Sequence, residues 1–234
     1  MPPPAEVGVP RPPRSQVRTL VLVRHGETDW NFSGRAQGHA DIPLNATGRR
    51  QAVSVAEVMT GFAPVRLWSS DLARARQTAD AIAGVTGLTV ECDPRLREYD
   101  VGERSGLTLA EAAERYPQEY AAYRAGATAT LVPGEETTEQ VRDRVVPALR
   151  DCLDRLRPAE TGVAVLHGAC LRVGLMGVIG WPWENARALT GIENGAYCVL
   201  THDLDQDRVR LTSYNEKAGG SGHGPDFAAD APVG

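Results

Sequence analysis

The sequence contains a single lysine, Lys217, so nearly all of its 25 basic residues are arginine. This bias is typical of a GC-rich genome, and arginine abundance is therefore no indication of an anion-binding site. The 30 acidic residues outnumber the 25 basic residues, so the chain has a formal net charge of −5. That balance argues against nucleic acid as a partner.

Cysteines and long apolar runs are scarce as well. The cysteines show no C-x-x-C spacing and no zinc-finger pattern with histidine, so we expect buried free thiols in a reducing compartment at Cys92, Cys152, Cys170 and Cys198. No run approaches the ~18 apolar residues of a membrane span. The proline-rich N-terminus lacks the apolar stretch of a secretory signal. We therefore expect a cytoplasmic protein with no membrane partner.

Between two irregular ends, the sequence alternates strand-like and helix-like segments. Residues 1–16 are proline-rich and residues 217–234 are glycine-rich, which predicts a disordered tail at each end of one domain over 17–216. Apolar runs predict strands at 19–23, 65–68, 88–92, 162–166, 196–202 and 209–213. Helical spacing predicts helices at 47–59, 72–85, 107–125 with a break near Pro117, from Thr137 onward with a kink or restart at Pro147, and at 168–179.

This alternation predicts an α/β fold in which helices cover both faces of a mostly parallel sheet. Ligands of such sheets bind beyond the carboxyl ends of the strands. Two predicted strands end in the same dipeptide, in VLVRHGET (21–28) and VAVLHGAC (163–170). If the strands are neighbours, His25 and His167 face each other. Gly168 would begin a helix, whose free N–H groups favour an anion.

Three arginines lie close to these strand ends in the sequence. Arg24 precedes His25 in a buried run and needs a partner, for which Glu27 is the nearest candidate. Arg74 and Arg76 follow another strand, and residues two apart cannot share one helix face. One of the two should therefore point inward, and we expect Arg76 to be a surface residue.

Paired guanidinium groups and a histidine suit the chemistry of a phosphoryl group. Guanidinium groups bind phosphoryl oxygens in pairs, and a neutral imidazole can attack phosphorus. A carboxylic acid is then needed to protonate the leaving alcohol. Spacing leaves three candidates for that acid, which are Glu98, Asp100 and Glu103.

Six blocks, in this order, resemble the histidine phosphatase superfamily, also called phosphoglycerate mutase-like. The blocks lie between Arg18 and Asn215 and read LVRHGETDWN (22–31), QGHADIPLNATGRRQA (37–52), SSDLARARQTA (69–79), LREYDVGERSG (96–106), PGEETTEQVRDRV (133–145) and VLHGACLRV (165–173). The resemblance implies a three-layer α/β/α sandwich with a mixed sheet. It also implies a phosphatase that uses a phosphohistidine intermediate and needs no metal or other cofactor.

The resemblance also implies roles for individual residues. His25 is the nucleophile, His167 stabilises the transition state and Glu98 donates the proton. The phosphate-binding set is Arg24, Arg74 and Asn31, and the helix start at Gly168 adds to it. Further substrate contacts are expected from Arg35, Gln37, Gly38 and Arg104.

One departure from the family pattern concerns the substrate. Where many relatives have G-x-W-E-G after the acid, this chain has arginine at Arg104 and serine at Ser105. Arg104 either favours a substrate with an additional negative charge or points to solvent. The pattern looks most like members that act on glucosyl-3-phosphoglycerate, whose carboxylate would give Arg104 or Arg35 a partner.

Other activities within the superfamily stay open. Mutases carry a Y-G-x-L-Q-G-x-N-K stretch that this chain lacks, so we expect a phosphatase acting on a small phosphomonoester. The alternatives are phosphoglycerate mutase-type transfer and a catalytically inactive scaffold that binds a phospho-ligand. Residues 107–138 are expected to cap the site, and relatives suggest a homodimer.

Overall fold

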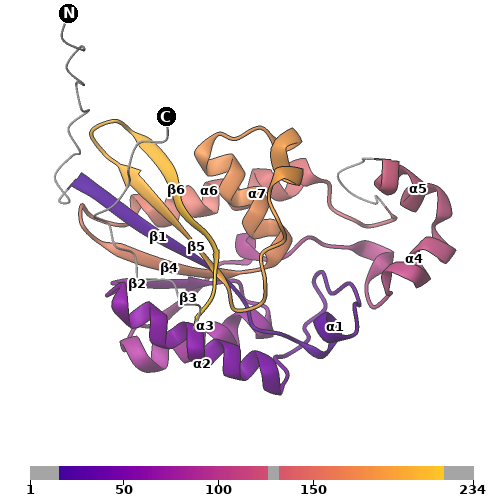
Figure 1. Cartoon of the computed structure of the whole chain (residues 1–234), viewed down its shortest axis with the longest axis horizontal. Helices are drawn as coiled ribbons and strands as arrows, with labels where there is room; N and C mark the ends of the chain where they lie inside the picture. Colours follow the sequence, from indigo (N-terminus) through magenta and orange to yellow (C-terminus); the bar gives the residue numbers. More distant parts are fainter. Residues whose placement is uncertain (1–15, 126–131, 219–234) are drawn as a thin grey trace, which may run out of the picture.

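The computed structural model describes residues 16–125 and 132–218, and its centre is a six-stranded sheet (Figure 1). In chain order the strands are β1 (Val17–Arg24), β2 (Arg66–Ser69), β3 (Val90–Cys92), β4 (Thr161–Leu166), β5 (Tyr197–Asp203) and β6 (Arg208–Glu216). Their spatial order is β3-β2-β4-β1-β5-β6. The first four in that order run parallel, whereas β5 is antiparallel to β1 and β6 is antiparallel to β5. The predicted mixed, mostly parallel sheet is confirmed.

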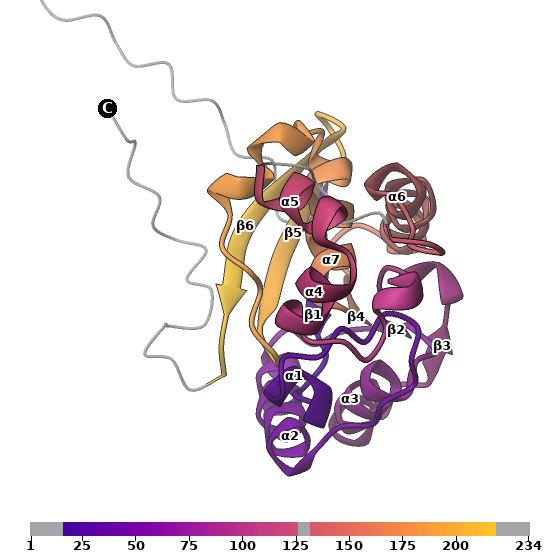
Figure 2. The ribbon, with the colours of Figure 1, turned by 90° about the vertical axis from the view of Figure 1, so that its right-hand side faces the viewer.

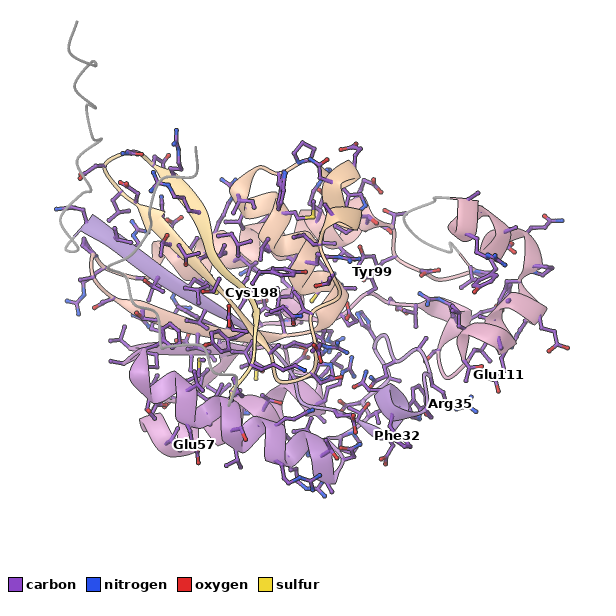
Figure 3. The ribbon with its side chains drawn as sticks, in the orientation of Figure 1. Phe32, Arg35, Glu57, Tyr99, Glu111 and Cys198 are labelled. Atoms are coloured by element: carbon purple, nitrogen blue, oxygen red, sulfur yellow. The ribbon has the colours of Figure 1, made fainter. Side chains whose placement is uncertain are left out.

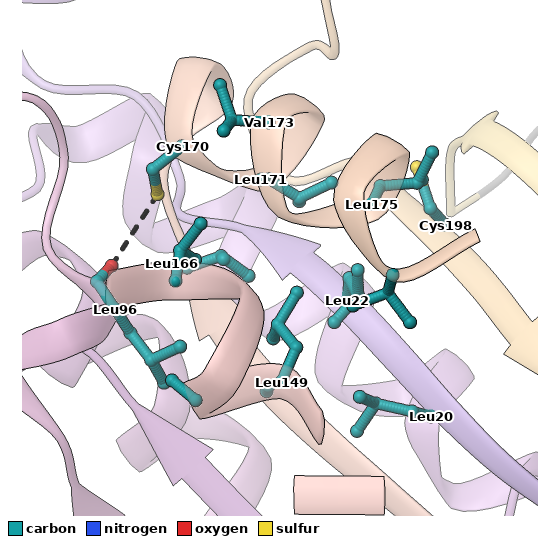
Figure 4. Close-up of a cluster of buried hydrophobic side chains, with 14 of the residues drawn as sticks. Leu20, Leu22, Leu96, Leu149, Leu166, Cys170, Leu171, Val173, Leu175 and Cys198 are labelled. Carbon is teal, nitrogen blue, oxygen red and sulfur yellow. Dashed lines mark hydrogen bonds between the residues drawn. The ribbon is translucent and has the colours of Figure 1, made fainter. Parts of the chain in front are cut away.

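Helices cover both faces of the sheet, as Figures 1 and 2 show. One face packs against α2 (Ala46–Gly61) and α3 (Ala73–Thr86), and the other against α6 (Thr138–Asp154) and α7 (Gly168–Ile179). The alternation of side chains along β1 explains this arrangement, because Leu20 and Leu22 enter one core while Val21 and Val23 enter the other. Figure 4 shows the leucine-rich core beneath α7.

The remaining helices lie beyond the carboxyl ends of the parallel strands (Figures 1 and 2). They comprise the short α1 (Asp29–Phe32), the pair α4 (Leu109–Arg115) and α5 (Pro117–Ala125), and 3-10 turns at Pro94–Leu96, Gly102–Arg104 and Trp183–Ala188. The break expected near Pro117 separates α4 from α5. Over the described ranges, none of the helices combines the length and the apolar character needed to cross a bilayer.

The expected kink or restart at Pro147 is wrong, since α6 continues through this residue as one helix. Pro147 is exposed, so the carbonyl that loses its helical N–H partner faces water. On the opposite side Val145 and Leu149 are fully buried and hold the helix against the core. The capping box expected at Thr137 is present, with its hydroxyl accepting from the N–H of Gln140.

Two further sequence predictions concern the cysteines and the ends of the chain. All four cysteines are free, but Cys92 is exposed at the end of an edge strand rather than buried. The expected tails fall outside the described residues except at Gln16, Lys217 and Ala218. The single domain over 17–216 stays a prediction.

Candidate active site

His25 and His167 follow two strands that are immediate neighbours in the sheet. Arg24 at the end of β1 pairs with Leu166 at the end of β4, so the next residue of each strand emerges at the same edge. Their ring centroids are 5.0 Å apart at an interplanar angle of 62°. Both side chains are buried, which confirms that the two histidines face each other.

His25 is held as a neutral imidazole with one free nitrogen. Its Nδ1 lies 2.6 Å from the carbonyl oxygen of Gly26, and because a carbonyl only accepts, Nδ1 carries the proton. Burial, followed by the charges of Arg74 and Arg24, lowers the pKa of His25 well below its usual value. The lone pair on Nε2 is therefore available to attack an electrophile.

His167 has the opposite tautomer. Its Nδ1 accepts a hydrogen bond from Nε of Arg74 at 3.1 Å, and its Nε2 donates to the hydroxyl of Ser70 at 2.9 Å. Burial and the charge of Arg74 lower the pKa of His167 well below its usual value as well. Sequence reasoning placed Ser70 in a family block without giving it a role.

Arg74 is the inward member of the arginine pair and is almost fully buried. Its two terminal nitrogens donate to the carbonyls of Gly38 and Ala40, each at 2.8 Å. Gly38 thus holds Arg74 through its backbone. Arg76 is exposed and forms an ion pair with Asp80, as expected of a surface residue.

Arg24 does not pair with Glu27, and that prediction is wrong. Its Nη1 donates to the carbonyl of Ile192 at 2.5 Å, while the Glu27 carboxylate accepts from the side chain of Asn45. Nε of Arg24 is buried without a partner. In the part of the chain described, neither Arg24 nor Arg74 forms an ion pair with a carboxylate. The two guanidinium groups therefore leave net positive charge beside His25.

The loop after His25 is fixed by close backbone packing. A Cβ atom added to Gly26 would lie 2.3 Å from the carbonyl oxygen of Gly48 in the first turn of α2. Gly48 in turn has no room for a side chain against the backbone of Glu27. Both positions need glycine for this approach. The loop after the nucleophile candidate is consequently packed tightly against the first turn of α2.

Glu98 is the carboxylate that lies at the histidines. Its two oxygens accept from the N–H groups of Tyr99, Ala169 and Cys170 at 2.9 to 3.1 Å, so it occupies the start of α7. The other two candidates turn elsewhere: Asp100 accepts from the N–H of Gly102, and Glu103 from the hydroxyl of Tyr116.

Arg144 fixes the loop that carries Glu98. This half-buried residue of α6 donates to the carbonyls of Arg95, Arg97 and Glu98 at 2.7 to 2.9 Å. It also forms an ion pair with Glu136 at 2.7 Å. Arg144 belongs to the sequence block at 133–145, but its role was not predicted because it lies far from Glu98 in the sequence.

Asn31 and Asn194 link the nucleophile loop to the loop before β5. Oδ1 of Asn31 accepts from the N–H of Thr28 and from Nδ2 of Asn194, which orients the Asn31 amide nitrogen away from both. Nδ2 of Asn194 also donates to the carbonyl of His25 at 3.1 Å. Gln37 accepts from the hydroxyl of Thr28. The sequence predicted Asn31 and Gln37 but gave no indication of Asn194.

Most of the predicted site residues line one cavity of about 350 Å³. Its wall is formed by Arg24, His25, Asn31, Arg35, Ala36, Gln37, Gly38, Arg74, Glu98, Tyr99, Val101, Arg104, Leu109, Glu135, Ala169, Arg172 and Trp183. All four residues expected to contact substrate are present. From the expected cap, only Leu109 and Glu135 among the described residues contribute to this wall. Arg172, Trp183 and Tyr99 were not predicted.

Two of the cavity's arginines already have carboxylate partners. Arg104 forms a 2.6 Å ion pair with Glu135, whose side chain is only 2% exposed. Arg104 therefore turns toward the cavity wall rather than out to solvent. Arg35 pairs with Glu111 of α4 at 2.9 Å, and Figure 3 shows the two side chains at the outer end of the molecule. Over residues 16–125 and 132–218, no cluster of three or more His, Cys, Asp or Glu residues could hold a metal ion.

The chain resembles known proteins over most of its length. The model of the histidine phosphatase superfamily (branch 1) matches residues 20–217. Glucosyl-3-phosphoglycerate phosphatase of Mycobacterium tuberculosis is 34% identical over 216 residues, covering 87% of this chain and 96% of that protein. A probable phosphoglycerate mutase of Cronobacter sakazakii is 39% identical over 173 residues, covering 73% and 79%.

Solved structures agree with this likeness. A mycobacterial glucosyl-3-phosphoglycerate phosphatase superposes with a TM-score of 0.76 at 36% identity, covering 85% of this chain and 98% of that one. The chain therefore belongs to the histidine phosphatase superfamily, and the prediction of a phosphatase enzyme is confirmed.

Proposed function

We propose that the protein hydrolyses a small phosphomonoester through a phosphohistidine at His25. The observation that carries this proposal is the neutral imidazole of His25, with Nε2 free, between two guanidinium groups that have no carboxylate partner. Such a site is electrostatically complementary to a phosphoryl group before substrate arrives.

In the first step, Nε2 of His25 attacks phosphorus and the bond to the leaving oxygen breaks. Arg24, Arg74 and the amide nitrogen of Asn31 hold the phosphoryl oxygens. His167 redirects its Nε2–H from Ser70 to one of these oxygens. The carboxylic acid form of Glu98 gives its proton to the leaving oxygen. The product alcohol departs and leaves phosphohistidine.

In the second step, water replaces the alcohol. The Glu98 carboxylate takes a proton from this water as its oxygen attacks phosphorus. The N–P bond breaks, inorganic phosphate leaves, and His25 regains its free Nε2. Apart from His167 and Ser70, each residue named in this cycle lies on the cavity wall.

Trapping of the intermediate tests this proposal. The enzyme is mixed with a ³²P-labelled phosphomonoester and the reaction is quenched rapidly. Acid treatment then distinguishes acid-labile phosphohistidine from acid-stable phosphate esters. We expect acid-labile label on the wild type and none on His25→Ala, which also loses phosphate release. Turnover by His25→Ala at the wild-type rate, or label that stays on another residue, would overturn the assignment.

For the substrate, we propose a phosphorylated carboxylic acid of the glucosyl-3-phosphoglycerate type. Its support is the likeness to the mycobacterial enzyme, which extends over 96% of that relative's length. The test is phosphate release from glucosyl-3-phosphoglycerate compared with 4-nitrophenyl phosphate. A kcat/KM for the sugar ester no higher than that for the aryl ester would remove this substrate.

A mutase is the second candidate, because a probable phosphoglycerate mutase is 39% identical. It predicts interconversion of 3- and 2-phosphoglycerate without net release of phosphate, which NMR distinguishes from hydrolysis. An inactive scaffold predicts phospho-ligand binding with neither reaction. A cytoplasmic location and a homodimer stay predictions. Light scattering, which measures the molar mass in solution, tests the homodimer.

A further inference from the structure

Five arginines line the active-site cavity, and they differ in what neutralises them. Arg24 and Arg74 lie at His25 and have backbone or imidazole partners. Arg35 and Arg104 are each paired with a carboxylate, Glu111 and Glu135 respectively. Arg172 is the fifth, and none of the described residues forms a hydrogen bond or an ion pair with its guanidinium group.

Arg172 lies on α7, five residues after His167, and its side chain is half-buried. Its Nε is fully enclosed and has no hydrogen-bond partner. The guanidinium carbon lies 5.8 Å from the centre of the Trp183 ring, in a cation–π contact. Contact with an aromatic ring supports the cation without using its N–H groups, so these groups stay available to a ligand.

We infer that Arg172 binds a carboxylate of the substrate, separate from the phosphoryl group held at His25. This inference rests on the proposed phosphatase function of the same cavity. A carboxylate matches two N–H groups of a guanidinium fork, and it would provide a partner for a cation that is partly removed from water. Arg172 is then a specificity-determining residue rather than a catalytic one.

The pairing of the other arginines supports this choice of residue. For Arg35 or Arg104 to receive the substrate carboxylate, each would have to share its charge with Glu111 or Glu135. The Glu135 side chain is 2% exposed, so separating it from Arg104 would leave a buried carboxylate with less compensation. Arg172 can bind an anion without breaking any ion pair.

The cavity also has suitable surroundings for an organic acid. The wall of this cavity also includes Tyr99, Val101 and Trp183. These side chains can contact the carbon skeleton, while the arginines at His25 bind the phosphoryl group and Arg172 binds the carboxylate. A substrate with a phosphate at one end and a carboxylate at the other is therefore selected by its charge pattern.

The experiment compares two substrates that differ in one group. Phosphate release is measured from 3-phosphoglycerate and from glycerol 3-phosphate, in which an alcohol replaces the carboxylate. The variants are Arg172→Met and Arg172→Lys, and Arg150→Met removes one exposed arginine from α6 as the matched control. Hydrolysis of 4-nitrophenyl phosphate and a thermal melt report on chemistry and folding in each variant.

We expect Arg172→Met to lower kcat/KM for 3-phosphoglycerate by roughly 10- to 100-fold, mainly through KM. The same variant should change the values for glycerol 3-phosphate and 4-nitrophenyl phosphate by less than about 3-fold, and Arg172→Lys should recover part of the loss. Equal losses on all three substrates, or no loss on 3-phosphoglycerate, would overturn the inference.

Binding measurements separate this inference from the proposed function. Calorimetry with His25→Ala and with His25→Ala/Arg172→Met reports affinity for the same two ligands without turnover. If the wild type releases no phosphate but Arg172 still gives the selective loss of 3-phosphoglycerate affinity, the hydrolase proposal fails and the carboxylate site holds. If the wild type hydrolyses the substrates but their affinity does not depend on Arg172, the carboxylate site fails and the hydrolase proposal holds.

Discussion

Gly168 lies directly against the guanidinium of Arg24. A Cβ atom at residue 168 would be 3.1 Å from Nε and 3.3 Å from the guanidinium carbon. The sequence predicted that the helix start at Gly168 favours an anion. The N–H groups of Ala169 and Cys170 in this turn are bound to the Glu98 carboxylate, and a contact between Gly168 and phosphate stays a prediction. Because Gly168 has no side chain, it leaves room for the guanidinium group of Arg24.

Replacing Gly168 with alanine should therefore displace Arg24. We expect Gly168→Ala to lower kcat/KM for phosphomonoesters by about 10- to 100-fold, the cost of a misplaced charge-assisted contact. Steady-state kinetics measure this. Gly84→Ala on α3 is the control, because a Cβ there meets nothing within 4 Å. The control should keep full activity, and equal losses in both variants would contradict the assignment.

Removal of the acid should depend on the leaving group. Glu98→Gln keeps the shape of the side chain but cannot donate the proton, so we expect alkyl phosphates to lose about 10²- to 10⁴-fold in kcat/KM. 4-Nitrophenyl phosphate, whose leaving group needs little protonation, should lose much less. The matched control is Glu103→Gln, at the carboxylate that bonds Tyr116. A uniform loss on both substrates would show that Glu98 is not the proton donor.

Loss of Arg144 should resemble a mild loss of Glu98. Arg144→Met removes the donors to three carbonyls of the acid-bearing loop, so Glu98 loses its fixed position while remaining present. We expect kcat for alkyl phosphates to fall by about 10-fold, with a smaller change for 4-nitrophenyl phosphate. If only thermal stability falls and this leaving-group difference is absent, Arg144 is merely structural.

Stability should decrease as the pH falls below about 6.5. The folded pKa of His25 and of His167 lies well below that ordinary value, so in this window the unfolded chain binds protons that the folded chain does not. Stability from this source is complete above the unfolded pKa and is lost on acidification toward the folded pKa. Each histidine should contribute up to ~1.4 kcal/mol per pH unit.

Denaturant unfolding between pH 7.5 and 5 measures this slope. His25→Gln and His167→Gln should each make the slope shallower by up to one proton per molecule, whatever their effect on stability at pH 7.5. Slopes identical to that of the wild type would mean that the two imidazoles titrate normally in the folded chain.

The sequence was sufficient to predict those strands and helix faces that show a short repeating pattern of apolar residues. Apolar runs followed by His-Gly predicted β1 and β4, and the parallel pairing of these strands brings His25 and His167 together. Helical spacing predicted Arg74 as the inward alternative to Arg76. These predictions succeeded because burial on a helix face or a strand end follows from local periodicity.

The features that the sequence left open depend on contacts between distant segments. The partner of Arg24 is a backbone carbonyl 168 positions away, and carbonyls have no side-chain identity to recognise in a sequence. Spacing did not separate Glu98 from Asp100 and Glu103; the family resemblance favoured Glu98, and the contact of its carboxylate with the start of α7 is visible only in the structure. Arg172 could have been noticed as one more arginine on the helix of His167, but its lack of a partner is visible only in three dimensions.

Arg24 and Arg74 form no ion pair with a carboxylate among the described residues, so an anion bound at His25 stabilises the folded chain. Any anion that neutralises them binds the folded chain and has no equivalent site in the unfolded chain, so it raises the melting temperature. At 100 times its Kd, such a ligand adds about 2.7 kcal/mol. The site thereby provides its own assay, in which thermal shifts rank candidate metabolites by fit before any turnover is measured, provided that phosphate is kept out of the buffer.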